Sequence, residues 1–416
     1  MRNEAAPRPA LSTFELVAMV AALSALNALA IDIMLPALPD IGRDFALSND
    51  NDRQLVIVMY VALFGVSQLA YGPLSDSFGR RSILIWALGI FIIGSVLCVV
   101  APSYELFLAA RALQGLGAAA TRVISVAVVR DLTEGRRMAQ VMSMAMTVFM
   151  IVPIIAPAIG QAILFVAPWR WIFGALLIYA LAVLAWAVLR LPETLRPEHR
   201  RALQPAVIAR GYLDVLRERQ TVGYMLASTC LTACLFAYIT SSEQLYVDVY
   251  ELGVAFPLAF AAIAIAISGG TFLNSRIVML HGMRRISHTM MLWFAAAAGV
   301  HAALAAFHAP PLWLFLSLLA LTFSVFGLIS SNFNTLAMTP VAHVAGSASA
   351  LFGAVTGTGG AILGALIARG FDGTATPFLT GLFLASLGTI AAVLWTERGR
   401  LLSDPAPNFQ NVETRN

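Results

Sequence analysis

The chain has 416 residues, of which 59% are hydrophobic and only 12% are charged, and its mean hydropathy is +0.82. Soluble domains are about 45–50% apolar and about 25% charged, so this composition excludes a water-soluble protein and predicts an integral membrane protein. All 26 basic residues are Arg and the net charge is +4, an excess that in membrane proteins is typical of cytoplasmic loops and does not indicate nucleic-acid binding.

Twelve apolar segments are long enough to cross a bilayer, which requires about 20 residues each. They cover residues 14–37, 54–73, 82–101, 104–129, 138–165, 170–190, 221–247, 254–275, 287–308, 312–337, 346–369 and 375–395. Short turns containing Pro102, Pro310 and Pro311 separate two pairs of them. The first segment has no small-residue cleavage site, so we expect it to be retained.

The arginines predict the orientation of these helices. Twenty of them fall on one set of loops and termini, and only Arg43, Arg53, Arg170 and Arg369 fall on the other. Since cytoplasmic loops carry the excess of Arg, both termini are predicted to be cytoplasmic.

The longest polar interval separates the sixth helix from the seventh. It predicts three parts: residues 1–190, an N-terminal six-helix bundle; 191–220, a cytoplasmic linker; and 221–416, a C-terminal six-helix bundle. The three cysteines, Cys98, Cys230 and Cys234, fall within apolar segments, where packing is favoured over a metal or disulfide role. We therefore predict an all-α integral membrane protein with no metal site.

Two loops at corresponding positions of the halves indicate an internal repeat. After the second helix stands Gly72-Pro73-Leu74-Ser75-Asp76-Ser77-Phe78-Gly79-Arg80-Arg81. After the eighth helix, residues 274–285 form a looser version that keeps a Gly followed by basic residues.

The first loop resembles the signature of the major facilitator superfamily, G-x-L-x-D-x-x-G-R-R. Helix four, with Arg111-Ala112-Leu113-Gln114-Gly115-Leu116-Gly117-Ala118-Ala119, and helix five, with Ala156-Pro157-Ala158-Ile159-Gly160, are similar to further motifs of that family. The segments Asp32-Ile33-Met34-Leu35-Pro36-Ala37-Leu38-Pro39 and Ala345-Gly346-Ser347-Ala348-Ser349-Ala350-Leu351 resemble the Bcr/CflA subgroup of drug:proton antiporters. The resemblance implies two pseudo-symmetric six-helix bundles in a bacterial inner membrane.

Three positions depart from the subgroup pattern. Gln161 follows Gly160 where paired glycines are usual, the end of helix seven reads Ser242-Glu243-Gln244 instead of Ser-Pro-Phe, and Arg122 lies deep in helix four. These departures concern the substrate and leave the predicted fold unchanged.

The resemblance also implies gating roles. Asp76 at the end of helix two is expected to cap another helix, and Arg80 to pair with Asp131, in a cluster that joins the halves while the cavity faces outward. Pro153 and Pro157 remove backbone donors and should bend helix five, and Gly160 should allow close packing. The full predicted gating set is Gly72, Asp76, Gly79, Arg80, Arg81, Asp131, Pro153, Pro157 and Gly160.

Four ionisable residues stand clear of the ends of the apolar segments, or nearly so: Asp32, Arg111, Arg122 and Glu243. Ionisable residues inside a membrane are costly and usually have a function. The alternative is that these four form buried ion pairs that fix helix packing. We predict Asp32 to be the proton-coupling acid, as its family position implies, with Arg111 as its electrostatic partner and a relay to Gln114.

Arg122 lies eleven residues after Arg111, which places both on one helix face, about 20° apart. It either faces the cavity, where it would favour an anionic or carbonyl-rich substrate, or extends toward the inner interface. Glu243 is either a second proton site or an interfacial acid. The predicted substrate-binding set is Asn27, Asp32, Arg111, Gln114, Arg122, Phe149, Gln161, Phe236, Tyr238 and Asn332.

Together these features predict a proton-coupled exporter of small amphipathic compounds such as chloramphenicol- or bicyclomycin-like antibiotics, working by alternating access. The alternative is an exporter of an endogenous, possibly anionic metabolite; an importer is disfavoured by the Pro157 and Gly160 motif. An enzyme is not expected, because the apolar segments hold no His/Asp/Glu cluster and no Ser/His/Asp set. The expected partners are a small-molecule substrate, protons and lipid, with no cofactor, no nucleic acid and a monomeric state.

Overall fold

The computed structural model describes residues 11–196, 198, 200 and 203–402. Within them, eleven segments are long and apolar enough to span a membrane, and the longest, Leu312–Arg369, folds back on itself as two crossings. The predicted all-α fold with twelve crossings is therefore confirmed. The crossings of the first half are α1 (Thr13–Asp32), α3 (Leu55–Phe78), α4 (Arg80–Val100), α5 (Tyr104–Leu132), α6 (Gly135–Leu164) and α7 (Arg170–Arg190). Those of the second half are α9 (Arg219–Glu243), α10 (Phe256–His281), α11 (Met283–Phe307), α12 with α13 (Leu312–Phe323 and Phe326–Met338), α14 (Ala345–Arg369) and α15 (Thr376–Thr396).

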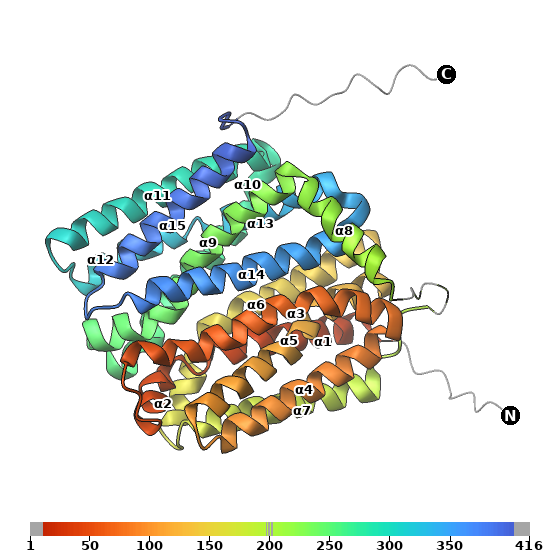
Figure 1. Cartoon of the computed structure of the whole chain (residues 1–416), viewed down its shortest axis with the longest axis horizontal. Helices are drawn as coiled ribbons and strands as arrows, with labels where there is room; N and C mark the ends of the chain where they lie inside the picture. Colours follow the sequence, from red (N-terminus) through yellow and green to blue (C-terminus); the bar gives the residue numbers. More distant parts are fainter. Residues whose placement is uncertain (1–10, 197, 199, 201–202, 403–416) are drawn as a thin grey trace.

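The two halves lie beside each other with their helices running in one general direction (Figure 1). Within the first half, α5 packs on α3 and α4, and α1 packs on α6; within the second, α9 packs on α14 and α15. The halves meet where α3 contacts α14 and where α6 contacts α10. A short helix, α8 (Pro205–Arg217), lies at the end where the chain passes from one half to the other. We call that end the linker side and the opposite end the far side.

The first crossing ends earlier than the sequence pattern predicts. Helix α1 stops at Asp32 rather than continuing to residue 37, and the chain turns into a 3₁₀ segment (Leu35–Ala37) and helix α2 (Leu38–Asp44). Pro36 and Pro39 are the second residues of these two helices. Proline favours a first helical turn and interrupts a longer helix, so each starts a new element.

The tenth crossing and the linker also differ from expectation. Ser324 and Val325 form a turn that divides the predicted segment 312–337 into α12 and α13. The interval 191–220 was predicted only as a polar linker, yet it contains α8. Its signal is Pro205 at the helix start followed by apolar residues at helical spacing.

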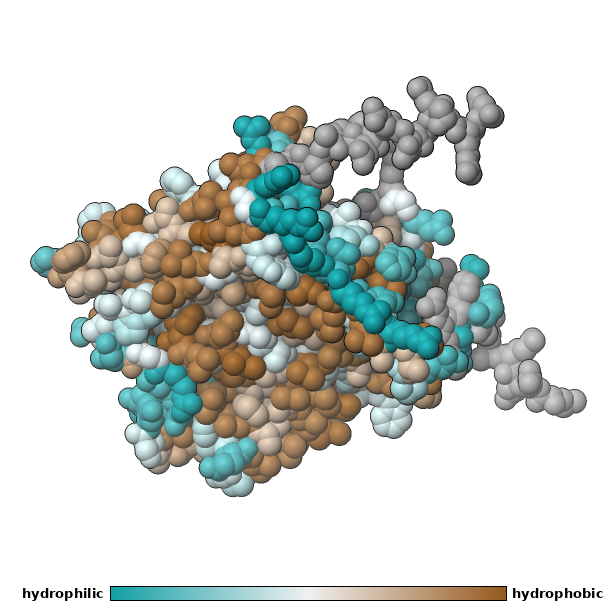
Figure 2. All heavy atoms as spheres, turned by 45° about the horizontal axis from the view of Figure 1, so that its top comes forward, coloured by the Kyte–Doolittle hydropathy of each residue, from teal (hydrophilic) through white to brown (hydrophobic). Residues whose placement is uncertain are grey.

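The outer surface of the helices is hydrophobic. Large apolar side chains face outward, among them Trp86, Ile178 and Phe272, which are 74%, 65% and 62% exposed. Figure 2 shows broad hydrophobic surface across the helices, with hydrophilic side chains gathered toward the ends and in one band. Such exposure is stable in contact with lipid chains and identifies a multi-pass integral membrane protein.

Candidate functional site

Helix α5 carries the central charged residues and is held close to its neighbours by glycines. A Cβ at Gly115 would overlap the carbonyl oxygen of Tyr60 in α3, and one at Gly117 would overlap the backbone of α4. Small residues let membrane helices approach until their backbones touch. This close packing fixes Arg111, one turn before Gly115, between α1, α3 and α5.

The guanidinium of Arg111 is completely buried, and three of its nitrogens donate hydrogen bonds. Nε donates to the carbonyl of Val56 (3.1 Å), Nη2 to the carbonyl of Ala30 (3.0 Å) and Nη1 to Oε1 of Gln114 (2.7 Å). Gln114 in turn donates to Oγ of Ser95 (2.8 Å). The predicted link from Arg111 to Gln114 is therefore present in the structure.

The predicted pairing of Arg111 with Asp32 is not seen. Among the ion pairs of the described residues, none joins these two side chains. Arg111 instead caps the last turn of α1 by binding the carbonyl of Ala30, where carbonyl groups lack helical donors. Arg111 thus holds the end of the helix that carries Asp32 and does not neutralise its carboxylate.

Asp32 is the last residue of α1 and is 4% exposed. Its Oδ1 has no hydrogen-bond partner among the described residues. The carboxylate interacts electrostatically with the phenols of Tyr60 in α3 and Tyr238 in α9, so it lies near both halves. Tyr60 also donates a hydrogen bond to Oδ1 of Asn27 (2.8 Å) and lies under the guanidinium of Arg111, 4.6 Å from its ring centroid.

Arg122 behaves differently from Arg111, although both lie on one face of α5. Its side chain is exposed, whereas that of Arg111 is completely buried. Ala118, Ser125 and Val129, which share its face, are buried. Placing Arg at the centre of a bilayer costs about 2.5–3.5 kcal/mol on insertion scales, which disfavours contact of this exposed side chain with lipid chains.

Glu243 ends α9 and is fully buried at the far side. Its Oε2 lies 3.2 Å from Nε of Arg53, which precedes α3 in the first half. Arg53 is also buried and forms a second ion pair with Asp248, in the π-helical turn Gln244–Val249. Glu243 is therefore part of an ionic contact between the halves, and Arg53 and Asp248 are site residues that the sequence did not identify.

Further polar contacts join the halves at the same level. Arg369 at the end of α14 pairs with Asp52 (3.3 Å), and the side-chain amide of Asn51 donates to the carbonyls of Arg369 (3.2 Å) and Phe371 (3.1 Å). Gln244 donates to Oδ1 of Asn51 (2.6 Å). Within the described part of the chain, all three ion pairs between the halves lie at the far side. The contacts of Arg53 and of Arg369 hold this side closed, and we call them the far-side latch.

Substituting Arg53 by Gln should open the far-side latch. Stranding the buried carboxylate of Glu243 typically costs several kcal/mol, so amide hydrogen exchange in residues 244–249 should accelerate at least about tenfold. The matched control is Arg43→Gln, which removes an exposed pair with Asp40 inside one half. Equal exchange rates for Arg53→Gln and the wild type would show that the ion pairs do not close this side.

The loop after α3 forms a compact ionic cluster at the linker side. Nη1 of Arg80 lies 2.5 Å from Oδ1 of Asp76, and its Nε lies 3.2 Å from Oδ2 of Asp131, as predicted for Arg80 and Asp131. Gly79 has φ = +99°, a left-handed conformation that favours glycine. Arg81 donates to the carbonyl of Val188 (2.8 Å).

Glu193, which the sequence did not identify, completes this cluster. Its two carboxylate oxygens accept hydrogen bonds from the backbone N–H groups of Arg80 (2.8 Å) and Arg81 (3.2 Å), the first residues of α4. A Cβ at Gly79 would overlap this carboxylate. Glu193 thus caps α4, whereas Asp76 pairs with Arg80. Gly72 has open space around it, so no close contact requires a glycine there.

Gly160 allows the close approach predicted for helix five. A Cβ at Gly160 would overlap the carbonyl oxygen of Ile33, directly after Asp32. Pro153 and Pro157 lie inside α6, which is continuous from Gly135 to Leu164. The predicted bend at these prolines stays a prediction.

The other predicted substrate-binding residues differ in their surroundings. Asn332 is buried and donates to Oδ1 of Asn274 (2.9 Å), which ties α13 to α10 inside the second half. Tyr238 is buried against the ring of Phe260, with 5.4 Å between centroids. Gln161 and Phe236 are half-buried, and the side chain of Phe149 lies outside the described residues.

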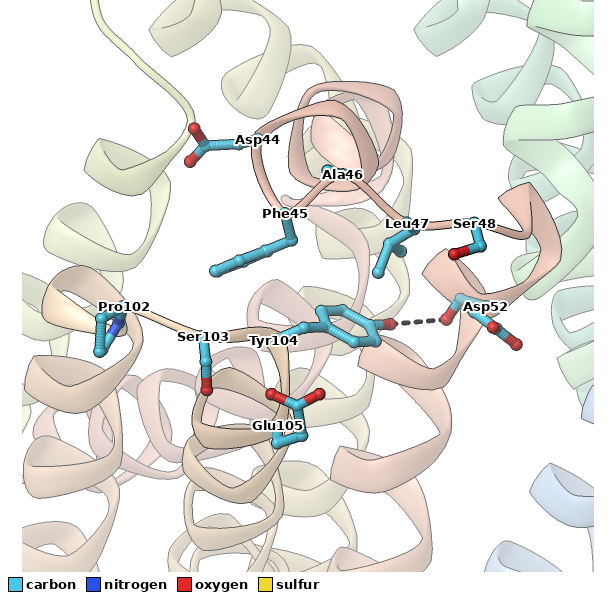
Figure 3. Close-up of a pocket in the computed structure, with 10 residues that line it drawn as sticks. All are labelled: Asp44, Phe45, Ala46, Leu47, Ser48, Asp52, Pro102, Ser103, Tyr104 and Glu105. Atoms are coloured by element: carbon cyan, nitrogen blue, oxygen red, sulfur yellow. Dashed lines mark hydrogen bonds between the residues drawn. The ribbon is translucent and has the colours of Figure 1, made fainter.

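A surface pocket lies at the far side and includes Asp52, the partner of Arg369 in the far-side latch. It is lined by Asp44, Phe45, Ala46, Leu47, Ser48, Asp52, Pro102, Ser103, Tyr104 and Glu105 (Figure 3). Tyr104 donates to the carbonyl of Asp52 (2.6 Å), and the carboxylate of Asp44 points away from that tyrosine toward Trp169 and Arg170, which it binds. These side chains hold the far ends of the first half together.

Comparison with known families decides the class of protein. The model of the Major Facilitator Superfamily matches residues 20–365, most of the chain. The chain belongs to this superfamily. It is therefore a secondary transporter of the Major Facilitator Superfamily and not an enzyme.

Relatives of this superfamily member include drug-resistance proteins. The bicyclomycin resistance protein homolog of Haemophilus influenzae is 32% identical over 377 residues, which are 88% of this chain and 92% of the relative. An uncharacterized MFS-type transporter of Bacillus subtilis, YdgK, is 31% identical over 90% of this chain and 93% of its own. The multidrug resistance protein MdtL of Escherichia coli is 29% identical over 89% of this chain and 92% of its own. These relatives confirm the resemblance to Bcr/CflA-type antiporters.

Solved structures of the superfamily share the fold. The human organic anion transporter MFSD10 aligns with a TM-score of 0.66 at 17% identity, covering 93% of this chain and 100% of that one. The xylose transporter XylE from E. coli, in a partially occluded inward-open conformation, aligns with a TM-score of 0.69 at 15% identity, covering 93% and 97%. At these identities the likeness concerns the fold alone.

Neutralising Asp76 of this superfamily member should impair transport and leave stability nearly unchanged. Its side chain is 38% exposed, and pairs with such exposure contribute about 0–1 kcal/mol, so the melting temperature of Asp76→Asn should match the wild type. We predict that the cluster around Arg80 takes part in gating, so the initial rate of substrate transport should fall. Asp214→Asn, which removes the exposed pair with Arg217 on α8, is the control. A normal transport rate for Asp76→Asn would remove the loop from the gating machinery.

Proposed function

We propose that this transporter is a proton-coupled exporter of small amphipathic compounds, including chloramphenicol- or bicyclomycin-like antibiotics, in a bacterial inner membrane. The observation that carries the proposal is Asp32, a buried carboxyl group at the end of α1 with an oxygen that has no hydrogen-bond partner among the described residues. A buried carboxylate without a cation partner is unfavourable. Binding a proton removes the charge of the carboxylate. A polar group of a substrate could instead stabilise the carboxylate by a hydrogen bond.

The position of Asp32 supports coupling between proton and substrate. It ends α1, where the helix dipole also opposes a negative charge, and Arg111 positions this end without neutralising it. The electrostatic influence of its carboxylate extends to Tyr238 in the second half. A change in the protonation of Asp32 therefore acts where the halves must move relative to each other.

The far-side latch supports alternating access, in which one side of the transporter is closed while the cavity is open to the other. Here the closed side is the far side. The excess of Arg on the linker-side loops favours placing that side, and both termini, in the cytoplasm. In this orientation, closure of the far side supports an inward-facing state. The pairing of Glu243 with Arg53 favours a role in the outer gate over a second proton site.

The test uses everted membrane vesicles from an efflux-deficient bacterium that expresses the chain. Respiration acidifies the vesicle lumen, and a transported compound should release protons and dequench an acridine dye, at a rate that depends on the compound. Vesicles from the empty host provide the control. If no antibiotic in a broad panel dissipates the gradient, the drug assignment fails and export of an endogenous metabolite becomes the better explanation.

A further inference from the structure

Arg122 carries a positive charge far from both ends of its membrane-spanning helix, and no ion pair neutralises this charge among the described residues. It lies ten residues before the end of α5, which corresponds to about 15 Å along the helix axis. No hydrogen bond or ion pair of its side chain occurs within the part of the chain that the structure describes. The nearest carboxylate along the same helix is Asp131, nine residues away.

The distribution of acids explains why Arg122 has no protein counter-ion. Every Asp and Glu in the membrane-spanning helices lies within three residues of a helix end. These residues are Glu15, Asp32, Asp76, Glu105, Asp131 and Glu243. Asp32 and Arg111 lie at the far-side end of the same bundle, and Arg111 is about 16 Å from Arg122 along α5.

Arg122 is exposed on a helix face whose other residues nearby, Ala118, Ser125 and Val129, are buried. Buried residues before and after it on that face pack against other helices, whereas Arg122 itself is reached by solvent. Because ion pairs join the halves at the far side, we expect solvent to reach Arg122 from the linker side. A guanidinium at such a position presents up to five N–H donors in a fork that matches a carboxylate.

We infer that Arg122 is the anion subsite of the transport cavity and that the preferred substrates are amphipathic compounds carrying a carboxylate. The inference rests on the proposed export function and assigns its substrate class. The carboxylate supplies the counter-ion that the protein lacks at this depth. The apolar part of the substrate then extends along α5 toward Asp32, whose proton exchange controls release.

Matched acids and esters test this assignment. The purified full-length chain, in nanodiscs of phosphatidylcholine, is titrated with three aryl carboxylic acids of increasing size, 4-biphenylcarboxylic acid among them, and with their methyl esters. The wild type should bind at least one acid more tightly than its ester by about 10- to 100-fold, the usual range for a charge-assisted hydrogen bond. Arg122→Ala should remove this preference while retaining ester affinity, and Arg122→Lys should retain part of it.

Arg130→Ala is the matched control, because Arg130 is exposed in the last turn of the same helix. It should leave the acid preference unchanged. The inference is overturned if no acid is preferred by the wild type, or if Arg122→Ala weakens acid and ester equally. It is also overturned if phosphatidylglycerol displaces the acid from the wild type but has no effect on Arg122→Ala, since a lipid phosphate then occupies the subsite.

The vesicle assay separates failure of this inference from failure of the export function. If neutral compounds dissipate the proton gradient and no acid preference exists, the exporter stands and the anion subsite falls. If Arg122 confers acid preference while no compound dissipates the gradient, the subsite stands and proton-coupled export falls.

Discussion

Asp32→Asn is expected to abolish proton-driven accumulation of substrate in everted vesicles while leaving the folded protein intact. Asparagine keeps the size of the side chain and cannot release a proton, so it resembles the protonated state permanently. Proton exchange drives the accumulation, so the accumulation ratio should fall to the level of vesicles from the empty host. Substrate exchange without a pH gradient should persist, because the cavity and the moving halves remain.

The control for Asp32→Asn is Asp40→Asn, which removes a carboxylate of α2 that pairs with Arg43 at the far side. That variant should accumulate substrate normally. If Asp32→Asn still accumulates substrate and still responds to collapse of the gradient, another group carries the proton. Glu243 is then the next candidate, and Glu243→Gln in the same assay would identify it.

The sequence predicted the crossings well because one physical quantity, the length of apolar chain, determines them. It also identified Asp32 and Arg111 correctly as buried, since charged residues in apolar segments are rare and must be enclosed. The boundaries were less accurate at Asp32, where the prolines of residues 36 and 39 start new helices within an apolar stretch. Hydropathy alone does not register that interruption.

Partners were harder to predict than burial. The sequence placed Arg53 in an outer loop. Its partners, Glu243 and Asp248, lie about 190 residues later in the chain, so the sequence near Arg53 does not reveal them. Asn332 was expected in the cavity, but Asn274 satisfies its amide inside the second half. The pairing of polar groups depends on the rotation of each helix and on the contact between the halves. The spacing of apolar residues along the sequence determines neither.

The pairing of Arg111 shows the same limit and leads to the second large effect. The sequence suggested a partner of opposite charge, whereas the guanidinium uses three nitrogens on Val56, Ala30 and Gln114. Arg111→Leu should lower the free energy of unfolding by about 3 kcal/mol or more, because hydrogen bonds from a charged donor contribute about 1.5–3 kcal/mol each. Relief of the buried charge offsets only part of this loss.

Arg111→Lys distinguishes geometry from charge. Lysine keeps the buried charge and its desolvation penalty, but it lacks the planar fork that reaches acceptors on three helices and lies over Tyr60. We therefore expect Arg111→Lys to unfold at a temperature as low as Arg111→Leu. The buried thiol of Cys98, 3.6 Å from Oε1 of Gln114, provides a local probe, since a thiol-reactive fluorophore should label it earlier on heating.

Arg285 provides the matched comparison for both substitutions. It is an exposed arginine in the first turn of α11, so Arg285→Leu and Arg285→Lys should unfold like the wild type. If Arg111→Lys is as stable as the wild type while Arg111→Leu is not, charge rather than hydrogen-bond geometry holds α1 to α5. Asp32 would then be positioned by electrostatics, and its direct pairing with residue 111 would have to form in another conformation of the transport cycle.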